Sequence, residues 1–241
     1  MKIEQCKDWK HFADRDPKRG IKYLVLHCFA LEVPEMIKVC NELGVGPHYI
    51  IDHAGKIIQL VSEDKVAWHA GKSHWRGEDS LNGSSIGIEL QNMSLGQTEY
   101  PKAQIDAFVT LAKDIMKRHH IKPENVVGHS DVAVVRKVDP NTAFPWQEMA
   151  GEKIGLWPIK TPVVSHKRSR TLLREIGYDV QDIDAALYAF MRRFMPERVA
   201  PETDISHAEE NLPSAVQKNA KMDKKVRQRL VQVAALYDKN R

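Results

Sequence analysis

Short runs of β-forming residues alternate with stretches of helical periodicity, and this alternation restricts the fold more than any other feature of the chain. Two consecutive runs are separated only by a turn at Gly55, which is typical of a hairpin. We therefore predict an α/β fold in which a mixed central β-sheet is flanked by helices. The predicted strands lie at 21–28, 47–52, 57–61, 85–90 and 124–129, and the predicted helices at 34–43, 101–116 and 145–155.

The C-terminal part of the chain has a purely helical pattern. Two helical stretches fill 169–196, and a basic amphipathic stretch follows at 214–238. The segment before them, 158–168, contains two prolines and little periodicity. With 241 residues, the chain is long enough for one packed domain and a smaller module. We predict a first domain over 1–157, a linker over 158–168, and a small all-α C-terminal module over 169–241.

Charge and hydropathy exclude several classes of partner. The net charge is only +4, and no dense stripe of lysine and arginine is interleaved with aromatic residues, so we predict no nucleic-acid partner. No stretch approaches the roughly 18 apolar residues of a membrane-spanning helix. Partner proteins cannot be named from the sequence.

The cysteines and the N-terminus predict a location in the cytoplasm. Cys6, Cys28 and Cys40 are odd in number and irregular in spacing, which argues for reduced thiols and not for a disulfide framework. Residues 1–20 contain no apolar run of the kind found in signal peptides. The alternative is a periplasmic or envelope-attached protein from which a leader has been removed.

Three side chains with metal-binding chemistry stand at predicted strand ends or just beyond them: His27, His129 and Asp139. Two imidazoles and one carboxylate form a three-ligand set for zinc that leaves one coordination position open. Water in such a position is a nucleophile at neutral pH, which indicates a metal-dependent hydrolase. Each residue also has a structural interpretation, with His27 as a satisfied core residue and Asp139, before a proline, as a turn residue.

Two further residues have charges at informative places. Glu89 lies in the apolar run Ile86-Gly87-Ile88-Glu89-Leu90, where a carboxylate is costly to bury without a partner. It is either a general base beside metal-activated water or a residue on the solvent face of a strand. Lys137 is either a surface lysine or a fixed positive charge beside a developing oxyanion.

Six segments, which appear in one order along residues 20–158, together have a specific pattern. They are YLVLH (23–27), PHYIID with GKIIQLV, AWHAGKSHWRG (67–77), LNGSSIGIELQN (81–92), VVGHSDVA (126–133) and KVDPNTAFPWQ (137–147). On these segments the chain resembles the zinc-dependent N-acetylmuramoyl-L-alanine amidases of the type-2 amidase family, which are relatives of the peptidoglycan recognition proteins. Many members have Asp-Pro-Gly-Pro where this chain has Asp139-Pro140-Asn141-Thr142, but Asp139 is retained.

The resemblance implies a function and a role for each candidate residue. His27, His129 and Asp139 are the expected zinc ligands, Glu89 the catalytic carboxylate and Lys137 the transition-state stabiliser. The expected reaction is hydrolysis of the amide between N-acetylmuramic acid, 1,6-anhydro forms included, and L-alanine of the stem peptide. Peptidoglycan or muropeptides are the expected substrates, in cell-wall turnover or recycling.

The loop from Trp68 to Ser84 adds candidate substrate contacts. Trp68 and His69 are predicted to form part of a wall for sugar or peptide, with loop packing as the alternative, which applies equally to Trp75. Asn82 is a predicted hydrogen-bonding partner of substrate or else a turn residue. Residues 169–196 resemble a degenerate peptidoglycan-binding helical domain, but the family's Asp-Gly-x-Phe-Gly loop is missing, so we predict a module that packs on the first domain.

Two other functions compete with the amidase. A peptidoglycan-binding recognition protein without activity typically lacks the third metal ligand, whereas Asp139, Glu89 and Lys137 are all present. A zinc peptidase that cuts within the stem peptide is not supported by any His-Glu-x-x-His motif.

Overall fold

The computed structural model describes residues 1–94, 98–158, 162–199 and 220–239, and it has the mixed α/β fold expected from the sequence. Six strands form the central sheet in the order β1-β5-β4-β9-β3-β10. Neighbouring strands are parallel except β4 and β5, which form the predicted hairpin. The strands are β1 (Ile3–Gln5), β3 (Tyr23–Phe29), β4 (Tyr49–Ile51), β5 (Ile57–Gln59), β9 (Ser85–Gln91) and β10 (Val126–Gly128).

Two small antiparallel pairs lie outside the sheet. One joins β2 (Ala13–Asp14) to β6 (Lys65–Val66), and the other joins β7 (His74–Trp75) to β8 (Glu78–Asp79). The segment predicted as a long loop therefore contains a hairpin and a short 3-10 helix, η1 (Leu81–Ser84). Neither pair has the four to eight alternating residues that reveal a strand in the sequence.

The predicted helices are present, but a short helix directly after β10, His129–Val132, was not predicted, and the last helix begins later than predicted. They are α1 (Val33–Leu43), α2 (Lys102–His119), α3 (His129–Val132), α4 (Trp146–Gly151), α5 (Ser169–Ile176), α6 (Ile183–Phe194) and α8 (Lys224–Lys239), with 3-10 turns η2 (Pro123–Asn125) and η3 (Pro196–Arg198). The last predicted helix was placed from 214, of which 214–219 lie outside the described residues. Residues 220–223 are not helical, because the Asp223 carboxylate accepts hydrogen bonds from the Lys225 and Val226 N–H groups and so caps the helix at its start.

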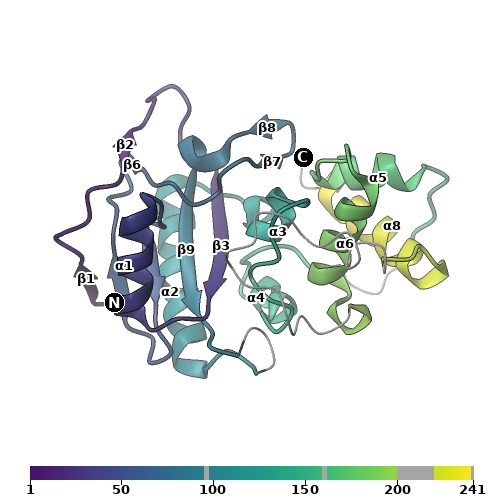
Figure 1. Ribbon diagram of the computed structural model, residues 1–241. Helices are drawn as coiled ribbons and strands as arrows, with labels where there is room; N and C mark the ends of the chain where they lie inside the picture. Colours follow the sequence, from purple (N-terminus) through teal and green to yellow (C-terminus); the bar gives the residue numbers. More distant parts are fainter. Residues whose placement is uncertain (95–97, 159–161, 200–219, 240–241) are drawn as a thin grey trace.

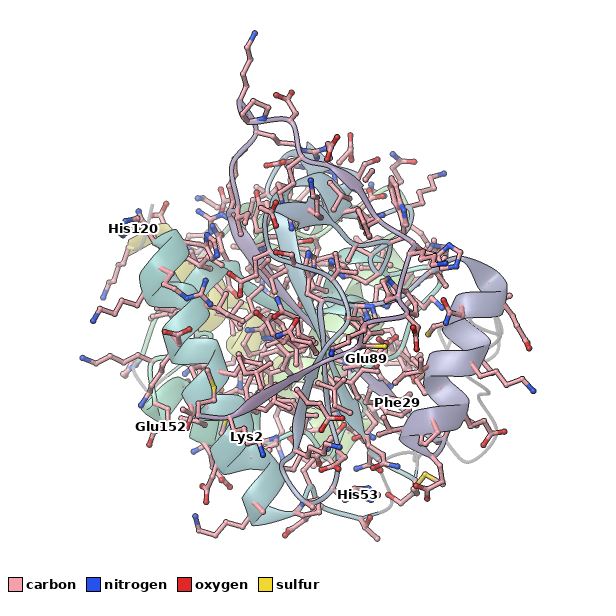
Figure 2. All side chains as sticks on the ribbon, turned by 90° about the vertical axis from the view of Figure 1, so that its left-hand side faces the viewer. Lys2, Phe29, His53, Glu89, His120 and Glu152 are labelled. Carbon is pink, nitrogen blue, oxygen red and sulfur yellow. The ribbon has the colours of Figure 1, made fainter. Side chains whose placement is uncertain are left out.

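The two faces of the sheet carry different layers. Alternate residues of β3 point to opposite sides, and Leu24, Leu26 and Cys28 pack with Phe108 and Leu111 of α2. On the other side, Phe29 packs in a cluster with Cys40 of α1. Figure 2 shows α1 and α2 on opposite sides of the strands, with the labelled Glu89 and Phe29 on the α1 side.

The C-terminal helices α5, α6 and α8 gather beyond β3 and α3, away from α1 (Figure 1). One continuous apolar cluster joins Tyr23 and Val25 of β3 to residues of all three helices. Trp75 of β7 is fully buried in this cluster, with its ring edge-on to those of Tyr178 and Tyr237. The predicted boundary at 158–168 therefore separates parts of the chain that share a core.

The face of β3 that bears His27 is thus covered by α1 near one end of the strand and by the C-terminal helices near the other. Among the described residues, no helix is both long enough and apolar enough to cross a membrane.

Candidate metal centre

His27, His129 and Asp139 converge although 112 positions separate the first from the last. His27 Nδ1 lies 2.9 Å from His129 Nδ1 and 3.0 Å from Asp139 Oδ2, and His129 Nδ1 lies 3.1 Å from the same oxygen. These edges are close to the roughly 3.3 Å edge of a tetrahedron whose metal–ligand bonds are about 2.0–2.1 Å long. The three donor atoms therefore fit a zinc ion with one further position free.

The sheet and one close backbone contact bring the three residues together. Strand β10 runs parallel to β3, so His129, which begins α3 directly after β10, reaches the same end of the sheet as His27. The Ser130 N–H donates to the Asp139 carbonyl at 2.7 Å. Gly128 permits this approach, since a Cβ there would lie 2.8 Å from Cδ of Pro140.

The protonation states of His27 and Asp139 suit metal binding. Burial and the adjacent His129 lower the pKa of His27 to about 4, so the ring is neutral at pH 7. Burial alone would raise the pKa of Asp139, but His129 and His27 outweigh it and hold that pKa well below the usual value. A neutral imidazole and an ionised carboxylate are the forms that bind zinc.

The outer nitrogens of both histidines have partners in the loop before η1. His27 Nε2 lies 3.0 Å from His69 Nδ1, and His129 Nε2 lies 3.2 Å from the Ala70 carbonyl oxygen. A histidine that binds metal through Nδ1 carries its proton on Nε2, so with a metal on Nδ1 His27 would donate to His69. His69 then carries its own proton on Nε2, which lies 3.1 Å from Ser85 Oγ. Such outer partners fix ring orientation and raise ligand basicity.

The position of His69 depends on a glycine. A Cβ at Gly87 of β9 would lie 2.5 Å from Cγ of the His69 ring, so the ring rests directly on the strand. Asn82 fixes the backbone at the same place, because its Oδ1 accepts hydrogen bonds from the N–H groups of His69 and Ala70 at 3.1 and 2.7 Å. The motif AWHAG and the residue Asn82 thus orient both histidines of the metal centre.

Glu89 lies beside the metal centre on the neighbouring strand. It is paired in register with His27, and therefore its side chain is on the same face of the sheet. Its Oε2 is buried and has no hydrogen-bond partner among the described residues. Burial and the nearby charge of Asp139 raise the pKa of Glu89 well above the usual value, against the opposing charge of Lys137. A buried carboxylate with a raised pKa is typical of a group that accepts and donates protons.

A cavity of about 510 Å³ opens over these groups. Glu89, Lys137 and the three candidate ligands line it together with apolar side chains of α1. Trp68, 40 % exposed, and His69 also line the cavity. Asn82 is not among the lining residues, and its amide oxygen is turned to the loop backbone; its contact with substrate stays a prediction. Trp75 is fully buried, which agrees with the alternative interpretation that it is a packing residue and not part of the cavity wall.

Several residues of this site were missed in the sequence. Ser85 and Gly87 orient His69, and the apolar wall comes from Met36, Val39 and Leu43 of α1. The spacing of these three along α1 marks an apolar helix face, which a sequence pattern assigns to the core, although Leu43 is 69 % exposed.

Three comparisons with known proteins agree. The family model of N-acetylmuramoyl-L-alanine amidase matches residues 17–142. The N-acetylmuramoyl-L-alanine amidase AmiD of Escherichia coli is 38% identical over 216 residues, which cover 76% of this chain and 78% of AmiD. The 1,6-anhydro-N-acetylmuramyl-L-alanine amidase AmpD of Enterobacter cloacae is 38% identical over 104 residues, covering 43% of this chain and 54% of AmpD.

Solved structures resemble nearly the whole chain. AmpDh3 of Pseudomonas aeruginosa, in complex with anhydromuramic pentapeptide, superposes with a TM-score of 0.74 at 27% identity, covering 96% of this chain and 97% of AmpDh3. AmiD in complex with anhydro-N-acetylmuramic acid-L-Ala-D-gamma-Glu-L-Lys has a TM-score of 0.66 at 30% identity, covering 91% of this chain and 97% of AmiD. The similarity therefore includes the C-terminal helices.

Proposed function

The chain belongs to the N-acetylmuramoyl-L-alanine amidase family, and from that premise we propose that it hydrolyses the amide between N-acetylmuramic acid and L-alanine of peptidoglycan stem peptides at a zinc ion held by His27, His129 and Asp139. The observation that carries the proposal is the convergence of three donor atoms beside a carboxylate that lines the same cavity. Solved relatives hold anhydromuramyl peptides, which supports muropeptides, 1,6-anhydro forms included, as the substrates in cell-wall turnover or recycling.

Zinc, when bound, supplies Lewis acidity, which makes water nucleophilic at neutral pH and polarises a carbonyl. The residues of the chain supply the proton transfers. Glu89 takes a proton from the attacking water, whose oxygen forms a bond to the lactyl carbonyl carbon. The same carboxyl then delivers that proton to the nitrogen of L-alanine as the C–N bond breaks. The raised pKa of Glu89 suits both steps, because a catalytic pKa nearer the operating pH makes both protonation states accessible.

Lys137 acts on the oxyanion. Its side chain lines the same cavity as Glu89, and its charge acts on the Glu89 carboxylate. A positive charge at this place stabilises the negative charge that develops on the carbonyl oxygen during attack.

Trp68, His69 and Asn82 complete the proposed binding site by different routes. The exposed ring of Trp68 offers a flat apolar surface to sugar or peptide. His69 contributes its ring to the cavity wall, while its two nitrogens are engaged by His27 and Ser85. Asn82 acts through the loop backbone that it holds.

The organisation and location of the protein are part of the proposal. We assign catalysis to residues 1–157 and support of that part to the helices of 169–241. All three cysteines are free thiols, which favours a reducing compartment and hence the cytoplasm. Cell fractionation with an antibody against the chain tests this location, and recovery with the periplasm or envelope would contradict it.

Digestion of defined muropeptides tests the function. The expected product is the whole stem peptide with a free L-alanine amine, identified by mass, and its release is expected to stop when a chelator removes the metal. Cleavage inside the peptide would identify a peptidase, and binding without release would identify a recognition protein.

Glu89→Gln tests the mechanism, with the exposed Glu99→Gln as a matched control. We expect Glu89→Gln to bind zinc and to lose about 10²–10⁴ in kcat, the range for general acid–base catalysis. Glu99→Gln is expected to keep the wild-type rate. Near-normal turnover by Glu89→Gln would rule out the proton-transfer role.

A further inference from the structure

Two consecutive arginines near the C-terminal end of α6 are almost completely buried: Arg192 is 3 % exposed and Arg193 is 2 % exposed. Arginine is rarely buried to this extent unless it is paired. Both side chains leave the helical part of the molecule and reach the segment 126–140, which carries two of the three proposed zinc ligands. Their contacts there are with backbone and one carboxylate.

Arg193 holds the segment that precedes His129 in the sequence. Its Nη1 lies 2.5 Å from Asp131 Oδ2, and its Nη2 donates to the Val126 carbonyl at 3.0 Å. The same Asp131 oxygen accepts the Gly128 N–H at 2.8 Å, and its other oxygen accepts the Tyr178 hydroxyl at 2.7 Å. The residue directly before His129 is therefore tied through Asp131 to Arg193 and Tyr178 of the C-terminal part.

Arg192 holds the segment around Asp139. Its Nη2 donates to the carbonyl oxygens of Val138 and Pro140, the two residues on either side of Asp139. The Asp139 carbonyl itself accepts the Ser130 N–H. Residues 133–145 belong to no described strand or helix, so their backbone groups lack the partners that a sheet would give them.

Apolar packing alone does not require charge at these positions. A guanidinium has several donors in a rigid planar fork, so it can fix carbonyl groups of irregular backbone at a set distance from a helix. We propose that α6 positions the metal centre through the chain segments next to its ligands. Arg192 and Arg193 are positioning residues that hold Asp139 and His129 in ligating geometry through the adjoining backbone. This role for the C-terminal helices rests on the zinc site of the proposed function.

The direct test measures zinc affinity of the full chain. Metal-free wild type, Arg192→Met and Arg192→Lys compete for Zn²⁺ with a chromophoric chelator, at a temperature well below each unfolding midpoint. We expect Arg192→Met to bind zinc about 10–100-fold more weakly, as for loss of other outer partners of a metal site. Arg192→Lys is expected to recover part of this loss, since one ammonium can donate to one of the two carbonyls.

Two further readouts separate positioning from general stability. In Co²⁺-substituted protein, Arg192→Met should change the visible absorption bands that report ligand geometry. On muropeptide with saturating metal, kcat should fall while KM, set by the cavity wall, stays within about twofold. A single change at Arg193 would leave the buried Asp131 carboxylate without its counter-charge. The double variant Asp131→Asn with Arg193→Met therefore tests the role of Arg193, with the same expected weakening of zinc binding.

Arg227→Met is the matched control. Arg227 also donates to two backbone carbonyls, but both, on Ser165 and Lys167, lie outside the metal-binding segment. Its loss should lower the unfolding midpoint and leave zinc affinity unchanged. Equal weakening in Arg192→Met and Arg227→Met, or unchanged zinc affinity and cobalt spectrum in folded Arg192→Met, would overturn the positioning role. Failure of wild type to bind zinc or release stem peptide would instead overturn the proposed function.

Discussion

The two halves of the metal centre are supported in different ways. His27 belongs to β3, which is hydrogen-bonded on both sides by β9 and β10, and its ring is oriented by His69. His129 and Asp139 follow the short edge strand β10, and buried charges from α6 hold the backbone beside them. Regular sheet positions a ligand through repeating backbone pairing. Irregular backbone needs specific side chains from elsewhere in the chain to do the same.

This contrast predicts that substitutions in the half supported by α6 cause the larger loss in the free energy of unfolding. Asp131→Ala removes the acceptor shared by Arg193, Tyr178 and the Gly128 N–H, and it leaves a guanidinium buried without its counter-charge. We expect a loss of about 3–5 kcal/mol in the free energy of unfolding, measured by urea denaturation of metal-free protein. A loss below about 1 kcal/mol would show that this half does not depend on the ion pair.

The charged cluster of Glu63, Arg118 and His119 allows the stability of the fold to be tested separately from metal binding. Burial alone would raise the pKa of Glu63, but hydrogen bonds from Arg118, His119 and Tyr49 outweigh it and lower that pKa to about 2. The pKa of Glu63 is near 4.5 in the unfolded chain and about 2 in the folded protein. At pH values between these two, the unfolded chain binds the proton more tightly. The contribution of Glu63 is therefore complete above about pH 4.5 and is lost as the pH falls through this range, at most roughly 3 kcal/mol.

Denaturant titration of wild type and Glu63→Gln as a function of pH measures this contribution. The variant should be less stable at pH 7, and the difference should disappear near pH 2. Zinc affinity at pH 7 is expected to stay at the wild-type value, because no contact joins Glu63 to the three ligands among those described. A change in zinc affinity would show that sheet stability and the metal centre are coupled.

Of the three free-energy changes, the change at His69 in the sheet half is expected to be the smallest. His69→Phe keeps a ring over Gly87 but removes the acceptor for His27 Nε2, so we expect zinc binding to weaken about 10–100-fold, or roughly 1.4–2.7 kcal/mol. His69→Asn, which retains an acceptor near the position of Nδ1, should recover part of this. Trp68→Phe, next to it and exposed, is the control. Chelator competition measures all three, and wild-type affinity in His69→Phe would assign ring orientation to the sheet alone.

Most of the fold followed from local patterns. The short runs of β-forming residues predicted β3, β4, β5, β9 and β10. The predicted end of α1 before Gly44 was also correct, and that glycine adopts φ 68°, the left-handed conformation that ends a helix. Strands β1, β2, β6, β7 and β8 are two or three residues long and were not predicted. Each contains at most one apolar residue, whereas the equally short β4, β5 and β10 lie in apolar runs, so only the pairing partner makes these five segments strands.

The candidate site also has a part that the sequence predicted and a part that only the tertiary structure decided. The amino-acid sequence by itself determined the chemistry, because imidazole, carboxylate and ammonium groups keep their character wherever the chain places them. The shared face of His27 and Glu89 comes from the register in which β3 pairs with β9, which alternation within either strand does not fix. Only the tertiary structure decided that Asp139 reaches His27, that His69 orients it, and that Arg192 holds carbonyl groups 52 and 54 positions away. These contacts join segments with no common period, so they exist only once the sheet and the C-terminal helices share a core.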